Sequence, residues 1–146
     1  MQVQWLILGG LLDNPALFST NEAEIFDKLL TDPQVRVIFE VSARVVRERG
    51  YLDAVKLLAE IGEVPAKARL ERRLSVQRYE PEAAREVVQR GLHQLAKQNI
   101  ERELPALARQ VKEARSLGDD GRALELTKER DQLFRSAQQA MQILKG

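Results

Sequence analysis

Residues 89–144, QRGLHQLAKQNIERELPALARQVKEARSLGDDGRALELTKERDQLFRSAQQAMQIL, decide the fold of this chain. Apolar residues recur there at three- and four-residue steps on both sides of Leu117-Gly118-Asp119-Asp120-Gly121, a spacing that keeps side chains on one face of a helix. They are Leu92, Ala96, Ile100, Leu104, Leu107, Val111 and Ala114, then Ala123, Leu126, Phe134, Ala137, Met141 and Leu144. Two helices joined by a short Gly/Asp connection predict an antiparallel helical hairpin.

The apolar face of the second helix is wider than a two-helix hairpin needs. At about 100° per residue it spans roughly 120°, whereas a lone pair of helices needs only a narrow seam. Its members are Ala123, Leu126, Leu133, Phe134, Ala137, Ala140, Met141 and Leu144. The pattern therefore predicts a third surface, either elsewhere in this chain or on a partner.

Composition favours an all-α protein. The chain has 146 residues, the size of one domain or of a compact domain with an appendage. Apolar residues make up 44% and charged residues 31%, as in soluble globular proteins, and aromatic residues only 5%. We expect a multi-helix bundle followed by a C-terminal two-helix hairpin on a long connecting helix. The net charge of +1 gives no global attraction to nucleic acid or membrane.

The start of the chain predicts a buried helix. Residues 3–12 are apolar almost all round, and Gly9 and Gly10 within them indicate close approach of another backbone. The stretch is too short to span a bilayer and no basic flank precedes it, so we expect no membrane contact and a cytoplasmic location. Asp32-Pro33 starts a further helix, capped by Gly50, which we expect to be central in the bundle.

A long helical pattern starting at Glu80-Pro81 leads into the hairpin. Pro105 lies within it and removes one helical hydrogen bond, so we expect a kink or break between Ile100 and Leu107. We accordingly divide the chain into a helical body, residues 1–90, and a hairpin, residues 91–146, with a joint near Pro105.

A basic stripe between residues 66 and 78 has two interpretations. Its cations are opposed only by Glu71 and comprise Lys67, Arg69, Arg72, Arg73 and Arg78. They could contact phosphates of nucleic acid. We favour a solvated face, and so expect direct nucleic-acid binding to be weak or absent.

Catalytic motifs are missing from the sequence. There is no glycine-rich phosphate loop, no Asp-x-Asp pair, no nucleophile motif and no cysteine, and His93 is the only histidine. We interpret His93 as structural and expect Asp119 or Asp120 to cap the last helix rather than bind a metal. We therefore assign no catalytic, cofactor-binding or metal-binding residue, and expect this chain not to be an enzyme.

The order of elements resembles the C-terminal helicase-binding domain of the bacterial DnaG-type replicative primase. The resemblance covers essentially the whole chain and has no single diagnostic motif. It rests on the opening Leu6-Ile7-Leu8-Gly9-Gly10-Leu11-Leu12-Asp13-Asn14-Pro15, on Phe39 and the helix ending Glu48-Arg49-Gly50, and on the hairpin with Leu117-Gly118-Asp119 at its tip and Ala123-Leu124-Glu125-Leu126-Thr127-Lys128-Glu129 after it.

The resemblance implies a six-helix body and a hairpin that docks on the N-terminal domains of the hexameric replicative helicase, while the body modulates the helicase. The zinc-binding and polymerising domains of the primase, a DNA-directed RNA polymerase, would precede this segment, so we expect Met1 to start an expressed fragment. Competing interpretations are the N-terminal domain of the helicase itself, which has a related bundle, and an unrelated helical adaptor.

On this hypothesis the partner-binding residues lie in the hairpin. Apolar anchors and a charged rim are the ordinary components of helix-on-helix recognition. The anchor candidates are Leu124, Leu126, Leu133 and Phe134, of which Phe134 could instead be buried within the hairpin, and Leu117 at the tip is a further partner-binding candidate. The rim candidates are Arg115, Arg122, Glu125, Lys128 and Glu129.

Overall fold

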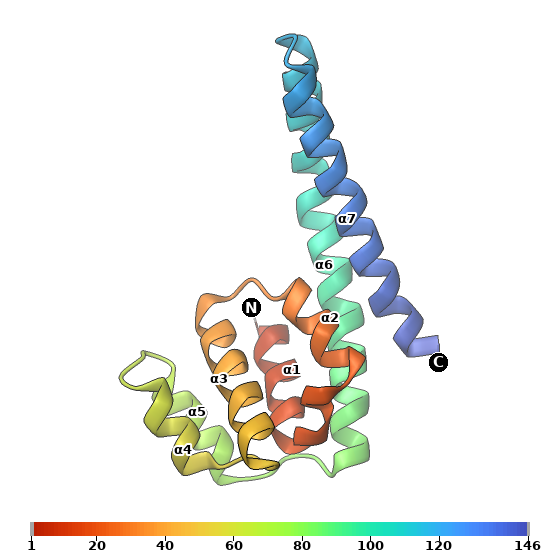
Figure 1. Ribbon diagram of the computed structural model, residues 1–146. Helices are drawn as coiled ribbons and strands as arrows, with labels where there is room; N and C mark the ends of the chain where they lie inside the picture. The colour runs from red at the N-terminus through yellow and green to blue at the C-terminus, as the bar shows by residue number, and fades with distance from the viewer. Residues whose placement is uncertain (1, 146) are drawn as a thin grey trace.

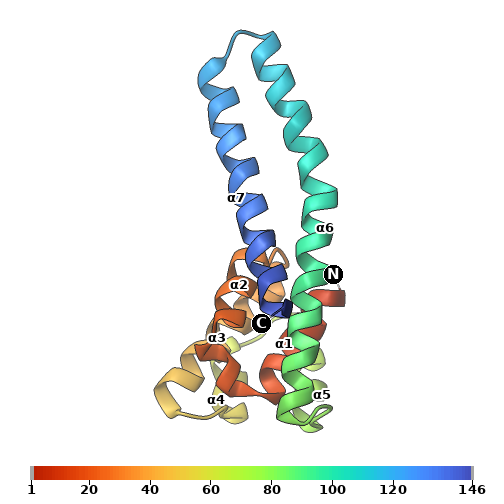
Figure 2. The ribbon, with the colours of Figure 1, turned by 90° about the vertical axis from the view of Figure 1, so that its right-hand side faces the viewer.

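The computed structural model describes residues 2–145, with the side chains of residues 140, 141 and 143–145 outside that description. Every element in the described range is helical, which confirms the all-α prediction. The elements are α1 (Gln2–Asp13), η1 (Pro15–Ser19), α2 (Asn21–Leu29), α3 (Pro33–Arg49), α4 (Ala54–Ile61), α5 (Lys67–Ser75), α6 (Pro81–Ser116) and α7 (Asp120–Lys145). The first six and the start of α6 form a body, from which α6 and α7 project side by side (Figure 1, Figure 2).

Helix α1 is the most enclosed helix of the body. Ile7, Leu8 and Leu11 are fully buried, as the apolar run predicted. A Cβ atom on Gly10 would lie 3.1 Å from the backbone oxygen of Ala84 on α6, which confirms the close approach expected there. A Cβ on Gly91 of α6 would lie 2.5 Å from Ile7 Cγ1, so glycines on both helices permit the tight packing of α1 against α6.

Helix α3 begins and ends where the sequence predicted. The Asp32 carboxylate accepts hydrogen bonds from the amides of Gln34 and Val35, and Gly50 ends the helix in the left-handed conformation with φ of 80°. Its expected central position is wrong. Val37 is 42% exposed, because one side of α3 packs on α1, α4 and η1 and the other side lies in solvent.

Of the kink or break expected at Pro105, a break is absent, because α6 is one continuous helix from Pro81 to Ser116. Proline removes the amide that would bond to the carbonyl of Glu101. Both residues are exposed, so water can bond that carbonyl instead, and the cost falls on a part of the helix outside the core.

Two separate apolar clusters lie along α6. Leu92, Leu95 and Ala96 belong to the core of the body, whereas Val111 and Ala114 pack with Ala123 and Leu126 of α7 near the far end. The predicted division at residue 90 thus falls inside a stretch of α6 that packs in the body. The packing changes between about residues 100 and 107, on either side of Pro105.

Helix α2 provides part of the third surface that α7 was predicted to need. Ala137 is 3% exposed and belongs to the core of the body, where α7 contacts α2 (Figure 1). The buried amide of Asn99 on α6 also donates to the carbonyl of Leu29, 3.2 Å away. Ala140, Met141 and Leu144, the other members predicted at this end, lie outside the described side chains.

A buried carboxylate links α2 to α6. The Glu22 side chain is 4% exposed and accepts hydrogen bonds from Arg85 and Gln89. Burial opposes its ionisation, but hydrogen bonds from Thr20, from its own amide and from these two side chains outweigh burial and lower the pKa of Glu22. The charged form of Glu22 therefore stabilises the packing of α2 on α6.

Candidate interaction surface

The tip of the hairpin is built by a short turn and a helix cap. Gly118 adopts the left-handed conformation with φ of 75°, which glycine tolerates best. The Asp119 carboxylate accepts a hydrogen bond from the amide of Arg122 at 3.0 Å, and its carbonyl accepts one from the amide of Ala123. Asp119 is thus the cap predicted for the last helix.

Two of the four predicted anchors are exposed, and so is Leu117, the further partner-binding candidate. Leu117 at the turn is 85% exposed, Leu124 in the first turns of α7 is 57% exposed, and Phe134 further along α7 is 44% exposed. Phe134 is therefore not enclosed between the two helices, the alternative considered for it. Large apolar side chains at a projecting tip form a surface that a partner can bury.

The other two predicted anchors are less exposed. Leu126 is 2% exposed and packs with Val111, Ala114 and Ala123, and Leu133 is half-buried. Leu126 therefore holds α7 to α6 and offers no free apolar surface, which corrects its assignment as an anchor. The three-residue step from Ala123 to Leu126 already placed Leu126, and not Leu124, on the apolar face of the last helix, so the sequence favoured burial of Leu126.

The predicted polar rim surrounds these side chains. All five rim residues are exposed: Arg115, Arg122, Glu125, Lys128 and Glu129. The guanidinium of Arg122 lies 3.4 Å from the carboxylate of Glu125, one turn along α7. A shallow hollow of about 210 Å³ lies beside the turn, lined by Leu117, Leu126 and Arg122 among others.

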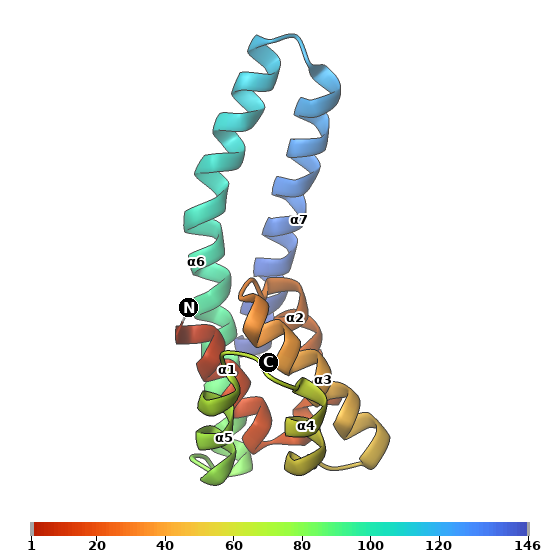
Figure 3. The same cartoon turned by 90° about the vertical axis from the view of Figure 1, so that its left-hand side faces the viewer.

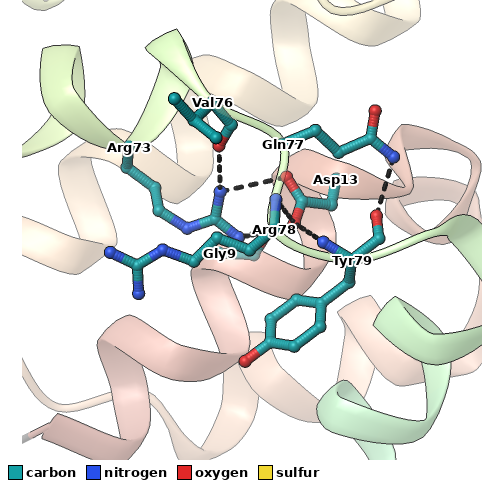
Figure 4. A network of polar contacts seen from close by, with 7 residues as sticks. All are labelled: Gly9, Asp13, Arg73, Val76, Gln77, Arg78 and Tyr79. Atoms are coloured by element: carbon teal, nitrogen blue, oxygen red, sulfur yellow. Dashed lines mark hydrogen bonds and ion pairs between the residues drawn. The ribbon is translucent and has the colours of Figure 1, made fainter.

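A buried ion pair in the body was not predicted. The carboxylate of Asp13, at the end of α1, accepts hydrogen bonds from both terminal nitrogens of Arg73 on α5, at 3.0 and 2.6 Å (Figure 4). It also accepts hydrogen bonds from the backbone amides of Arg78 and Tyr79, at 3.2 and 3.0 Å. The Arg73 guanidinium also donates a hydrogen bond to the carbonyl of Gly9 at 3.0 Å. A Cβ atom added to Gly9 would lie 2.8 Å from Arg73 Nε. Gly9 thus admits a side chain rather than the backbone we expected.

The sequence held only weak signals of this network. Asp13 precedes Asn14-Pro15 and is sufficiently explained as part of a helix stop, and Arg73 is one of five cations in the basic stripe. Their separation of 60 positions hides the pairing. The stripe is now divided, because Arg73 is paired internally and Lys67 lies 3.2 Å from Glu63, whereas Arg69, Arg72 and Arg78 are exposed.

The remaining polar candidates form no reactive arrangement in the described part of the chain. The buried Nδ1 atom of His93 has no hydrogen-bond partner there. No group of three or more histidine, aspartate or glutamate side chains among the described residues could hold a metal ion. Within the same range, no helix combines the length and the apolarity needed to cross a membrane.

Comparisons with known proteins add no assignment. No protein family, curated protein or solved structure matches the chain. We therefore infer the function of the chain from the geometry of the hairpin and of the body.

Proposed function

We propose that this chain is the helicase-interaction module of a bacterial replicative primase, which docks the primase on the hexameric replicative helicase through the tip of the hairpin. In this proposal the parent protein is an RNA-synthesising primase of the cytoplasmic replication machinery, and this segment contributes binding rather than catalysis.

The observation that supports the proposal is the exposure of large apolar side chains at the projecting end of the hairpin. Leu117 and Leu124 are 85% and 57% exposed, although both could have been replaced by polar residues without loss of the hairpin core. Their position beyond the body lets a partner approach from several sides (Figure 2). The arrangement of a body with a hairpin on a long helix also agrees with the resemblance described above.

Binding would use helix-on-helix contact. Leu117 and Leu124 would enter apolar depressions between helices of the partner, while Arg115, Lys128 and Glu129 would lie at the wetter edge. Buried apolar anchors govern affinity in such interfaces, whereas rim charges chiefly alter association rate and specificity.

Substitution of the two tip leucines tests the proposal. Isothermal titration calorimetry would compare the unchanged chain with Leu117→Ser/Leu124→Ser against the purified hexameric helicase. A buried hot spot costs about 2 kcal/mol or more on truncation, so we expect Kd to rise by roughly 30-fold or more. Thermal unfolding should be unchanged, because neither side chain belongs to an apolar cluster.

The matched control is Val55→Ser on α4, which removes an apolar side chain that is 80% exposed but lies in the body. It should leave helicase binding unchanged. Undiminished binding by the leucine variant, or equal loss in the control, would refute docking through the tip. No heat of binding for the unchanged chain would refute the helicase assignment itself.

A further inference from the structure

A basic cavity lies on the body, far from the hairpin tip. It has a volume of about 440 Å³, within the range of about 300–1,000 Å³ usual for small-ligand sites. Its walls come from the first turns of α1, from α5 and from the segment before α6, and α1 and α5 lie side by side (Figure 3). The residues that line it include Trp5, Arg69, Arg72, Arg78 and Tyr79.

The cavity has a surplus of positive charge. Arg73 in its wall is neutralised by Asp13, but Arg69, Arg72 and Arg78 form no ion pair with a carboxylate of the described residues. No acidic residue from this part of the chain lines the cavity. Three exposed guanidinium groups around one hollow favour an anionic ligand with several charges, since arginine binds phosphate through paired hydrogen bonds.

Aromatic side chains accompany these cations. The guanidinium of Arg69 lies 4.2 Å from the centre of the Trp5 ring, and Tyr79 is partly exposed in the same wall. The Tyr79 ring points away from the Asp13 carboxylate that holds its amide (Figure 4). Rings and guanidinium planes of this kind are surfaces on which unpaired bases stack.

The Asp13 network fixes the geometry of this wall. Asp13 binds the amides of both Arg78 and Tyr79, and Arg73 donates to the carbonyl of Val76 at 3.3 Å. The segment carrying Arg78 and Tyr79 is thus held before any ligand arrives, which reduces the entropy lost on binding.

We propose that this cavity binds single-stranded nucleic acid, contrary to the weak or absent binding expected from the sequence, because the fold brings the cations of the stripe together with Trp5 and Tyr79. Arg72 and Arg78 contact phosphates, and a base stacks on Tyr79 or on the pair formed by Arg69 and Trp5. Unpaired strands are favoured over a duplex because paired bases are enclosed in their own stack, and over an acidic peptide because aspartate and glutamate carry no aromatic ring to stack on the aromatic wall. This inference does not rest on the proposed docking to a helicase.

The test uses the full chain and a fluorescently labelled oligothymidylate of about 20 nucleotides, longer than one binding site of this class. Anisotropy gives Kd at several salt concentrations, and Trp5, the only tryptophan in the sequence, reports occupancy of the cavity by a change in its fluorescence. We expect binding that weakens with salt, and a Trp5 signal that saturates with the anisotropy.

Charge reversal separates the cavity from general electrostatics. Arg72→Glu/Arg78→Glu should raise Kd by about tenfold or more and lower the salt slope by about 1.4, which is about 0.7 per lost phosphate contact on a single strand. The matched control, Arg47→Glu/Arg49→Glu on the exposed end of α3, changes net charge equally and should alter Kd by less than about twofold if contact rather than total charge decides. Circular dichroism verifies that both variants stay folded.

Several results would overturn the proposal. They are no binding at low salt, an unchanged Trp5 signal during binding, equal weakening by the control, duplex DNA binding as tightly as the single strand, or displacement of the oligonucleotide by polyaspartate at equal charge. Because Leu117 and Leu124 lie outside the cavity, none of these results would affect the helicase titration.

Discussion

Removing the Asp13 carboxylate should destabilise the body more than breaking an ion pair on the surface would. Asp13→Ala removes the acceptor for both Arg73 nitrogens and for the amides of Arg78 and Tyr79. The side chains of Arg73 and Asp13 are only 12% and 6% exposed, so the guanidinium is left largely buried without its counter-charge. Breaking a buried pair in this way costs about 3–5 kcal/mol.

That cost is a large fraction of the free energy of unfolding of a whole domain, which is about 5–15 kcal/mol. Urea unfolding followed by circular dichroism would measure it, and the corresponding fall in Tm is about 10–15 °C for a chain of this size. Combining Asp13→Ala with Arg73→Met, which removes the charge and keeps an apolar stem, should recover part of the loss. We expect a coupling free energy of about 2 kcal/mol or more.

The surface pair between Arg36 and Asp27 is the matched control. Its charged atoms are 2.9 Å apart, but its side chains are 36% and 55% exposed, so Asp27→Ala should cost less than about 1 kcal/mol. A loss for Asp13→Ala no greater than for Asp27→Ala, or a coupling to Arg73 near zero, would show that the Asp13 network does not stabilise the body.

Three further substitutions and one control test the packing, each by urea unfolding. Leu126→Ala should cost about 2–5 kcal/mol, because Leu126 is 2% exposed between α6 and α7; a cost below about 1 kcal/mol would contradict its burial. Gly91→Ala should cost about 1–3 kcal/mol through contact with Ile7, whereas Gly121→Ala, whose Cβ would have its nearest contact at 3.8 Å, should be neutral or stabilising. Glu22→Gln should cost about 1 kcal/mol at neutral pH. Folding lowers the pKa of Glu22 below its usual value of 4.5. The stability that the Glu22 carboxylate provides is therefore complete above pH 4.5 and is lost as the pH falls through the folded pKa. The difference in stability between Glu22→Gln and the unchanged chain should accordingly disappear in acid.

Local signals in the sequence predicted the ends of several helices. Asp32 followed by Pro33 starts α3, Gly50 ends it, and Asp119 caps α7. Each signal concerns backbone groups within four residues, where side-chain chemistry determines the conformation almost alone.

Properties that depend on distant residues were not predictable in this way. The interior of α6 keeps its helix at Pro105, where Glu101 and Pro105 are exposed residues so that water can bond the freed carbonyl, and exposure is a tertiary property. Asp13 and Arg73 meet only after α1 and α5 have packed. Patterns of one helix fix which side chains share a face, but not how that face is oriented.

The continuity of α6 determines how the two proposed sites can communicate. The last residue of α6 bonded to the body is Asn99, and the helix from there to Ser116 rises about 25 Å at about 1.5 Å per residue. A partner held at Leu117 and a strand held at Arg72 would therefore occupy opposite ends of the molecule and could bind together. Coupling between them requires a conformational change in α6 or in its packing against α7, so Leu126→Ala, which loosens that packing, should alter such coupling. If both affinities, and the effect of each ligand on the other, were the same in this variant as in the unchanged chain, the hairpin would serve only as a tether.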